Sequence, residues 1–543
     1  MAVIIIVSLM HIPLELWCDV FFMLGNGRYI DCTGSIPAED VLTMHKGMHA
    51  ITQQWATCYI FWKIYSIFGY EGIFGIIYVV GAITLLVYYR LLIYACDNKF
   101  IALSLLLPIG VLTLRLFFYA RPQIFSYLLL LLSVLTLEEY VRTERKKHLA
   151  PLLLISVLLI NLHAAVWPIL PIIISTYAVA CLPIQKIDEA FVNMPSSVAK
   201  GIFFILPFTV IAALINPFGF EAITYGWASY DSSLIKNSWI EMEPLTVRHF
   251  YGPVFYFLVG LFLLMSGKLK NKFVYFLLSC GFIYMTMFSA RNLVLFLLFG
   301  TLSFAFMLRS IKLPPVETES LNQRQKKMIS FMIVFLWLST LPFLSNFSEK
   351  LNDMPTIRIL LWLLENIILA YIVIGLTRCK MQIRIALIMF MMIFSISSFN
   401  SSAGITCDYK ENDARFKIAE YIRAHDVREN ITVFSEDSLG SYMEFCGFLP
   451  FIDNRNEVFI AKNNHEYDYF GEYFYLLKGY IYYEDFFQKY KFDYIITTDT
   501  GSFVLDNALL HDKRYELLAE WDYRNIKGVK PVVYHLFKVK DNR

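Results

Sequence analysis

Charged residues are scarce in this sequence. They make up 17% of the 543 residues, whereas hydrophobic residues make up 57% and the mean hydropathy is +0.54. Soluble globular proteins contain about 25% charged and roughly 45–50% apolar residues. The composition therefore excludes an ordinary soluble protein and indicates a membrane protein. The net charge of +2 gives no bias toward nucleic acid, so we expect no nucleic-acid partner.

Several common signatures are also missing. The nine cysteines include no CxxC pair and no His/Cys spacing typical of zinc, so the sequence predicts no zinc site. The C-terminal region has no P-loop, no GxGxxG sequence and no nucleophile elbow, which excludes the usual patterns of nucleotide binding and serine hydrolysis. No internal repeat is visible, and this argues against a transporter built from two related halves.

The charges that are present concentrate near the C-terminus. Residues 405–543 contain 18 Lys/Arg and 24 Asp/Glu, about 30% of that segment, whereas residues 1–404 contain the other 29 and 21, about 12%. This division predicts an all-α polytopic membrane bundle over residues 1–400 and a soluble α/β domain over residues 401–543. One expected helix and three expected strands support the α/β class, at 411–425, 431–434, 492–498 and 532–539.

Thirteen apolar segments are candidates for membrane spans, which need about 20 mainly apolar residues each. They are residues 2–18, 72–89, 100–118, 123–137, 149–161, 168–184, 201–215, 253–266, 273–288, 292–308, 328–345, 356–376 and 384–399. Lys and Arg concentrate in alternate short loops, which indicates that these loops face the cytoplasm. We therefore expect a multi-pass protein of the cytoplasmic membrane, with the first long loop and the C-terminal domain outside. The apolar start of the chain is predicted to be the first span, because no basic segment precedes it and no cleavage site follows it.

Two predicted outer loops, residues 19–71 and 216–252, are too long for simple connectors. The first contains acids, glycines and a pair of glutamines, and the second contains Glu241 and further acids. Long loops on a rigid scaffold are where binding and catalysis are usually found. We therefore expect the functional site at the outer end of the bundle.

A series of short motifs runs from these loops into the C-terminal domain. Asp19 follows the first span and precedes GRYI at 27–30, GSIPAED at 34–40 and QQW at 53–55. Further motifs are RPQ at 121–123, NLH at 161–163, NPFG at 216–219, IEMEP at 240–244 and GSYMEFCGFLPFIDNR at 440–455. Together they resemble the bacterial polytopic members of the GT-C glycosyltransferase superfamily, which are lipid-phosphate-sugar-dependent and mannosyltransferase-like. The resemblance covers nearly the whole chain. It implies a GT-C-like bundle, a polyprenyl-phosphate-linked sugar donor, an outward-facing active site and an Asp of the first outer loop as catalytic base.

Asp19 and Asp40 both match the position of that base. Asp19 lies directly after the first span, and Asp40 is the acid of the P-x-x-D motif. A general base must lie within hydrogen-bonding distance of the acceptor hydroxyl and keep its charge, which either carboxylate could do. Each acid could instead cap a helix, Asp19 the one that follows it and Asp40 one that starts near Val41.

Arginines near the predicted span ends are candidate ligands of the donor phosphate. Arg28 lies in the first loop, Arg115 and Arg121 flank the connection after the third span, and Arg291 interrupts an apolar stretch. An arginine at the bilayer edge usually faces a cavity and has a partner, and its guanidinium can bind phosphate with two hydrogen bonds. Each of these arginines could instead reach to the membrane surface or form a structural ion pair.

Other polar residues of the predicted outer face are candidate sugar ligands. Gln53, Gln54 and Trp55 could hydrogen-bond to a sugar and stack on it, although the same residues could pack at the headgroup level of the membrane. His163 and Glu241 belong to the same face. Glu241 could be a second acid opposite Asp19 or an exposed loop carboxylate.

The sequence makes no firm cofactor prediction. His45 and His49 would share one side of a helix, but no third metal ligand is near them in the sequence. A divalent metal is therefore left open. In the C-terminal domain, Asp453 and Arg455 follow an apolar strand, and they predict a salt-linked turn.

The sequence thus predicts an inverting glycosyltransferase of the GT-C type that works at the outer face of the cytoplasmic membrane. It would move a sugar from a polyprenyl-phosphate-linked donor to a glycan, lipid or protein acceptor. The carboxylate would deprotonate the acceptor while arginine stabilises the departing phosphate. Two alternatives stay open: a transporter or flippase of lipid-linked saccharide, and a non-catalytic assembly subunit that binds partners through its soluble domain.

Overall fold

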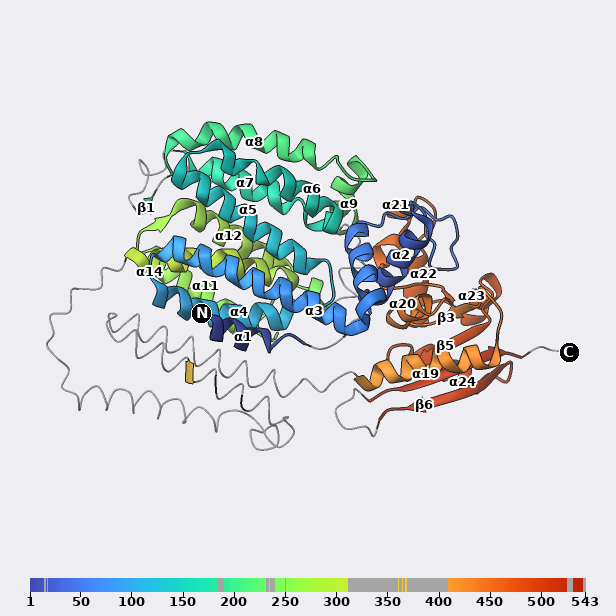
Figure 1. Cartoon of the computed structure of the whole chain (residues 1–543). Helices are drawn as coiled ribbons and strands as arrows, with labels where there is room; N and C mark the ends of the chain where they lie inside the picture. The colour runs from blue at the N-terminus through green and yellow to red at the C-terminus, as the bar shows by residue number, and fades with distance from the viewer. Residues whose placement is uncertain are drawn as a thin grey trace, which may run out of the picture.

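A computed structural model shows the arrangement of the chain (Figure 1). It describes residues 1–310 apart from 14–15, 17, 183–189, 193, 231–233, 235–239 and 250, and residues 409–540 apart from 525–530. Between 311 and 408 it describes only residues 360, 364, 367 and 368. The last three predicted spans therefore fall almost wholly outside the described residues, and so does the predicted domain boundary near residue 400.

The N-terminal part of the chain is a bundle of apolar helices. Four helical segments of the described residues are long and apolar enough to cross a membrane: Trp55–Cys96, Gln123–Thr143, Lys146–Val166 and Ala290–Arg309. The helices of the bundle are α1 (Ala2–Leu9), α3 (Trp55–Cys96), α4 (Lys99–Phe117), α5 (Gln123–Thr143), α6 (Pro151–His163), α7 (Ile169–Ala180), α8 (Ala199–Ala212), α9 (Phe220–Tyr230), α11 (Gly252–Ser266), α12 (Phe273–Phe288), α13 (Leu293–Leu295) and α14 (Thr301–Ser310). These helices lie side by side in Figure 1 and bury their apolar faces against one another.

The apolar segments predicted between residues 72 and 308 all coincide with helices of this bundle. The segment 2–18 is shorter than predicted as a helix, because α1 ends at Leu9. The polytopic helical class is therefore confirmed, whereas the number of thirteen spans stays a prediction.

The first predicted loop is largely helical. It contains α2 (Asp19–Thr33) and the first turns of α3, which extends from Trp55 as one helix with a kink at Gly69. Gly69 has φ +64°, a conformation that residues with a Cβ rarely adopt, so the kink depends on glycine. Residues 34–54 between the two helices are irregular, with one isolated bridge from Glu39 to His49.

The proposed helix start at Val41 is therefore wrong. Asp40 instead closes a turn, in which its Oδ2 accepts the backbone N–H of Thr43 at 3.0 Å.

The C-terminal domain is α/β, as predicted. Its sheet has the order β4-β3-β5-β7-β6, with β3 parallel to β4 and β5, and β7 antiparallel to β5 and β6. The strands are β3 (Thr432–Phe434), β4 (Leu449–Pro450), β5 (Tyr494–Thr498), β6 (Tyr515–Asp522) and β7 (Val533–Val539). The helices are α19 (Tyr409–His425), α20 (Asp437–Phe445), α21 (Ala461–Asn464), α22 (Tyr469–Leu477), α23 (Tyr483–Lys489) and α24 (Phe503–His511). The helix and the three strands expected from the sequence are all present.

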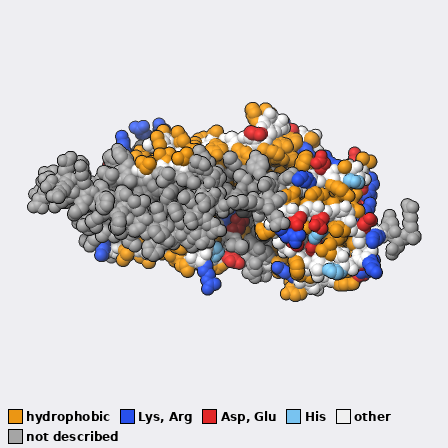
Figure 2. Space-filling view, turned by 90° about the horizontal axis from the view of Figure 1, so that it is seen from below, with side chains coloured by type: hydrophobic (Ala, Val, Ile, Leu, Met, Phe, Trp, Pro, Cys, Tyr) orange, Lys and Arg blue, Asp and Glu red, His pale blue; other side chains and the backbone are white. Residues whose placement is uncertain are grey.

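Residues of the first loop join the bundle to this domain. Helix α2 lies between the two parts in Figure 1, and the rings of Phe21 and Tyr442 are 4.8 Å apart. Met48 and Ala50 belong to the same buried cluster as Phe451 and Phe459 of the C-terminal domain. The view in Figure 2 shows charged side chains gathered over the C-terminal domain, whereas hydrophobic side chains predominate on the visible surface of the bundle.

Candidate functional site

A cavity of about 610 Å³ lies where the bundle, the first loop and the C-terminal domain meet. Helix ends and connections of the bundle form most of its wall, and residues 454–457 of the C-terminal domain close one side. Part of the wall is apolar and comes from α7, α12 and α13. The residues of this part are Ile169, Ile172, Met285, Phe288, Val294 and Leu295.

Asp19 is held at the edge of this cavity by two partners. It is in the first turn of α2, where the helix dipole favours a carboxylate. Its Oδ2 pairs with Nε of Arg121, and its Oδ1 accepts a hydrogen bond of 2.9 Å from Nδ2 of Asn454. The Asp19 and Arg121 side chains are 19% and 16% exposed, so the pair is mostly shielded but still reaches the cavity.

Arg121 also links Asp19 to the second predicted loop. Its Nη1 lies 3.4 Å from Oε2 of Glu241. Arg121 is in the connection between α4 and α5, and the burial that opposes its charge is outweighed by Asp19 and Glu241, so its pKa is raised. One guanidinium therefore bridges two acids from different segments.

Arg291 lies on a break between helices, opposite the same acids. It belongs to a short turn, Ala290–Asn292, between α12 and α13. This turn is tied to the Glu241 segment, because Ser289 Oγ donates to Glu241 O at 3.1 Å and Ala290 N donates to Glu243 O at 2.9 Å. Burial raises the pKa of the Glu241 carboxyl, but Arg291 and Arg121 outweigh burial and lower it overall. Glu241 is therefore ionised beside two guanidinium groups.

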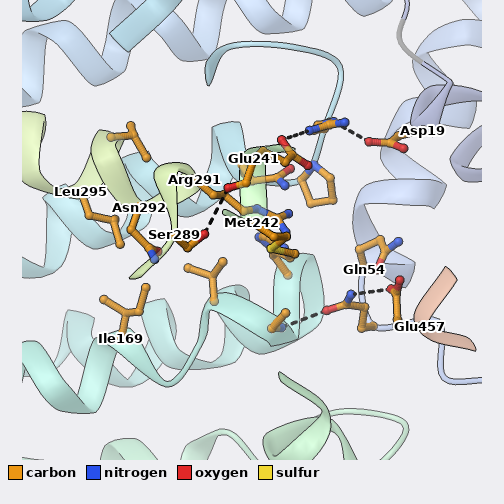
Figure 3. A pocket seen from close by; sticks show the side chains of 18 of the residues that line it. Asp19, Gln54, Ile169, Glu241, Met242, Ser289, Arg291, Asn292, Leu295 and Glu457 are labelled. Atoms are coloured by element: carbon orange, nitrogen blue, oxygen red, sulfur yellow. Dashed lines mark hydrogen bonds and ion pairs between the residues drawn. The ribbon is translucent and has the colours of Figure 1, made fainter. Parts of the chain in front are cut away.

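Gln53 and Glu457 connect the first loop to the C-terminal domain, and Glu457 lies on the side of the cavity away from Ile169 and Leu295 (Figure 3). Gln53 Nε2 donates to Glu457 Oε1 at 3.4 Å, and Gln53 Oε1 accepts the backbone N–H of Ala165 at 3.0 Å. Tyr225 OH donates to the same oxygen of Glu457 at 3.3 Å. Burial raises the pKa of the Glu457 carboxyl above its ordinary value.

The structure brings most of the predicted site residues together. The predicted residues that line the cavity are Asp19, Gln53, Gln54, Arg121, His163, Glu241 and Arg291. His163 is buried at the end of α6, where its Nδ1 lies 2.9 Å from Oγ of Ser126.

Four other predicted residues lie outside this lining. Trp55 Nε1 donates to Asn161 Oδ1 at 2.8 Å, and Arg28 packs over the rings of Trp62 and Phe445. Arg115 is buried in α4.

The fourth, Asp40, is buried in an ion-pair network of the first loop and the C-terminal domain. Its Oδ1 accepts from Arg455 Nη2 at 2.7 Å, and Arg455 Nε is 2.9 Å from Asp453 Oδ2, which forms the predicted salt-linked turn. Glu444 Oε2 lies 4.0 Å from the same guanidinium, and burial raises the pKa of Glu444 well above its ordinary value. The position of Asp40 is that of a residue that fixes Arg455.

Sequence reasoning missed the contribution of residues 454–457. Asn454, Arg455, Asn456 and Glu457 all line the cavity, about 435 positions away from Asp19 in the sequence. The only signal is the polar run DNRNE directly after the apolar residues Phe451 and Ile452. Such a run also fits an exposed turn, so it does not reveal the cavity.

One further group of side chains could hold a metal ion. Ligand atoms of His49, Glu221 and His465 lie within 4.8 Å of one another, and His49 Nε2 is 2.8 Å from Glu221 Oε1. Two imidazoles and a carboxylate are common zinc ligands. The proposed pairing of His45 with His49 is wrong, because His45 Nε2 instead contacts Phe451 O at 2.8 Å and the segment is not helical.

Comparisons with known proteins agree with this architecture. No protein-family model and no curated protein matches the chain. Two solved structures share its fold: ArnT from Cupriavidus metallidurans bound to undecaprenyl phosphate, with a TM-score of 0.52, and the same protein in the apo state, with a TM-score of 0.50. In both cases the sequence identity is 11%, and the match covers 98% of this chain and 96% of the other. ArnT is a GT-C glycosyltransferase, so the resemblance expected from the sequence is confirmed at the level of the fold. The same fold and the apolar helices make the chain a membrane protein.

Proposed function

We propose that this membrane protein transfers a sugar from a polyprenyl-phosphate-linked donor to an acceptor at the outer face of the cytoplasmic membrane. One observation carries the proposal: a carboxylate, Asp19, and two arginines, Arg121 and Arg291, border one cavity that continues into an apolar wall. An apolar wall suits a prenyl chain, and guanidinium groups suit a phosphate. The shared fold with a protein bound to undecaprenyl phosphate supports the same donor chemistry.

The proposed reaction is a single displacement. Asp19 takes the proton from an acceptor hydroxyl, and the acceptor oxygen forms a bond to the anomeric carbon of the donor sugar. The bond from that carbon to the phosphate oxygen breaks, and the lipid phosphate leaves with the bonding electrons. Arg121 and Arg291 stabilise the charge that develops on the phosphate, and the attack from the opposite face inverts the anomeric carbon.

The pairing of Asp19 with Arg121 is compatible with this mechanism. The pair orients the carboxylate, and donor phosphate can compete for the same guanidinium. Binding of the phosphate would then weaken the contact of Arg121 with Asp19 and free the carboxylate oxygen to face the acceptor hydroxyl. Of the two candidate bases, Asp19 is therefore the one that we assign, because Asp40 lies outside the cavity lining.

The sidedness of the site is part of the proposal. The C-terminal domain lies at one end of the bundle and β1 (Phe191–Val192) lies at the opposite end (Figure 1). Strand β2 (Asn271–Lys272) pairs with β1, and the cavity lies on the side of the C-terminal domain. The basic connection that contains Lys268, Lys270 and Lys272 includes β2, and such connections face the cytoplasm. The cavity end would then be outside.

Binding of undecaprenyl phosphate to the purified protein in nanodiscs tests the proposal. Replacement of Arg291 by Met should weaken binding about tenfold or more, because a hydrogen bond to a charged group contributes about 1.5–3 kcal/mol. The matched control is Arg142→Met. Arg142 is near the end of α5 that lies farther from the cavity, which Gln123 lines at the start of the helix. Equal affinities for all three proteins would contradict the assigned phosphate site.

Complementation of a deletion strain tests the enzyme against the transporter and assembly alternatives. A deletion strain should lack one sugar at its surface, and the wild-type gene should restore it whereas Asp19→Asn should not. Restoration by Asp19→Asn at matched expression would favour a non-catalytic role.

A further inference from the structure

The cavity changes in chemistry from one end to the other. In Figure 3, Ile169 and Leu295 lie on one side, Arg291 and Glu241 lie in the middle, and Gln54 and Glu457 lie on the other side, together with Asp19. The order is therefore an apolar part, then an arginine beside an acid, and then an amide with two carboxyl groups. A lipid-phosphate sugar has the same order of parts.

Unsatisfied amide oxygens mark the third part of the cavity. Among the residues that the structure describes, four amides of the lining have a buried side-chain oxygen that accepts no hydrogen bond: Gln54, Gln123, Asn454 and Asn456. Gln54, Gln123 and Asn456 are 6%, 8% and 3% exposed. A buried acceptor without a donor costs about 1–3 kcal/mol, so such groups are usually satisfied by a ligand or water.

The orientation of two of these amides is determined by their neighbours. Asn454 Nδ2 donates to the carboxylate of Asp19 at 2.9 Å, and Asn456 Nδ2 donates to Asp437 Oδ2 at 3.2 Å. Only the NH₂ group of an amide can donate, so in both residues the nitrogen faces the carboxyl group and the oxygen is the free acceptor. The cavity therefore offers acceptors at fixed places.

The parts of the donor differ in what they can give to these acceptors. A prenyl chain has no hydrogen-bond donor, and an ionised phosphodiester has only acceptors. The hydroxyl groups of the sugar are the donors of the molecule. Glu457 is also an acceptor here, and the carboxylate of an acidic sugar, which can only accept hydrogen bonds, would meet acceptors in place of a donor.

We infer that Gln54, Gln123, Asn454, Asn456 and Glu457 form the subsite for the glycosyl group of the donor, and that this group is a hydroxyl-rich sugar without a carboxylate. The inference rests on the proposed function and adds to it a sugar class and a role for the C-terminal domain. Three of the five residues come from that domain, so the C-terminal domain recognises the sugar while the bundle binds the lipid phosphate. Asp19 shares Asn454 with this subsite, which places the base beside the sugar.

The test compares lipids that differ only in the sugar. The probes are undecaprenyl phosphate alone and the same lipid bearing a glucosyl, mannosyl, galactosyl or glucuronosyl group, and affinities are measured for the full-length protein in nanodiscs. We expect at least one neutral glycosyl lipid to bind about tenfold more tightly than the bare lipid, and the glucuronosyl lipid to show no such gain. Gln54→Met and Asn456→Leu should each reduce the gain about fivefold, the effect of one hydrogen bond, and leave the affinity for bare undecaprenyl phosphate unchanged.

Asn26→Leu is the matched control. Asn26 is a buried amide of α2 whose oxygen also accepts no hydrogen bond among the described residues, but it does not line the cavity. It should therefore retain the full gain. Each variant is first checked for an unchanged elution volume and thermal midpoint. If one variant is too unstable, Gln123→Met takes its place.

The outcomes distinguish a failure of the proposed function from a failure of the sugar subsite alone. If the wild-type protein does not bind bare undecaprenyl phosphate, the proposed function fails and the subsite fails with it. If it binds the bare lipid but no neutral sugar adds affinity, the subsite alone is refuted. A gain that survives in both amide variants, or a gain for the glucuronosyl lipid equal to that for neutral sugars, also refutes it.

Discussion

Replacement of Asp40 by Asn should damage stability and leave the chemistry intact. Asp40 Oδ1 accepts from Arg455 Nη2 at 2.7 Å, and Asp40 Oδ2 accepts from the backbone N–H of Thr43 at 3.0 Å. Asparagine has one oxygen, so its NH₂ group would face either the guanidinium or the N–H of Thr43. In both orientations one donor faces another donor. The Asp40 side chain is 0% exposed, so water cannot relieve this mismatch.

The size of this effect follows from the burial of the network. Removal of one partner of a buried ion pair costs about 3–5 kcal/mol. Asp453 still holds Arg455 in the variant, with Nε 2.9 Å from Oδ2, so we expect the lower end, about 3 kcal/mol. For a domain of the size of residues 401–543, a loss of about 3 kcal/mol corresponds to a decrease of about 10 °C in the midpoint of unfolding.

The assay pairs this variant with Asp19→Asn. Midpoints are measured by size-exclusion chromatography after heating, and function by restoration of the surface glycan in a deletion strain at matched expression. Asp40→Asn should have the lower midpoint and should restore the glycan at a permissive temperature. Asp19→Asn should have a nearly normal midpoint and should fail to restore it, because loss of a general base costs about 10²–10⁴-fold in rate.

The opposite pattern would refute the reasoning. If Asp40→Asn has the wild-type midpoint but no function, and Asp19→Asn is functional, then Asp40 is the base and Asp19 is a structural partner of Arg121. A functional protein in both cases would remove the first loop from the mechanism.

Three further predictions follow from the same contacts. Arg291→Lys keeps the charge but loses the planar guanidinium, so donor affinity and turnover should fall together; unchanged values would leave Arg291 as a membrane anchor. Burial raises the pKa of Asp437 from 3.8 to about 6, so the unfolded state ionises first as the pH rises, and the C-terminal domain should lose about 2 kcal/mol of stability between pH 4 and pH 7. Asp437→Asn should remove this decrease, which is measured as the unfolding midpoint against pH. Zinc at about 100 times its dissociation constant should stabilise the wild-type protein by about 2.7 kcal/mol and so raise its thermal midpoint, but it should not raise the midpoint of His465→Ala. Equal shifts in both proteins would exclude the group of His49, Glu221 and His465 as the zinc site.

Most of the fold could be predicted because its signals are local. Runs of apolar residues such as 100–118 and 273–288 become helices α4 and α12 in place, since burial of a whole helix in lipid or protein needs only composition and length. The end of α1 at Leu9 was missed although the sequence contains a signal for it. His11, Pro13 and Glu15 follow the helix, and a proline shortly after a helix commonly marks its end. The kink at Gly69 was also missed, because the helical residues before this glycine were predicted to belong to the loop 19–71.

The site could be predicted only in part, because several of its contacts join distant segments. Four residues were correctly expected to lie near one another, because each is close to the outer end of a predicted span or in an outer loop: Asp19, Arg121, Arg291 and Glu241. Sequence alone could not separate Asp19 from Asp40, since both are acids of one loop and only burial distinguishes them. The contribution of Asn454 depends on how the C-terminal domain docks onto α2, and no local pattern contains that information.

The docking network explains why these distant segments can form one site. Replacement of a buried ion pair by apolar residues is often neutral or stabilising, so the group of Asp40, Asp453 and Arg455 is poorly explained as a source of stability alone. Its geometry defines one position of the C-terminal domain, because Arg455 must meet Asp40 of the first loop. The residues beside Arg455 are Asn454, which holds Asp19, and Asn456, which lines the proposed sugar subsite. A displacement of the domain would therefore break the ion pair, release the proposed base Asp19 and open the proposed sugar subsite together, so we expect the protein to be active only when this domain is docked.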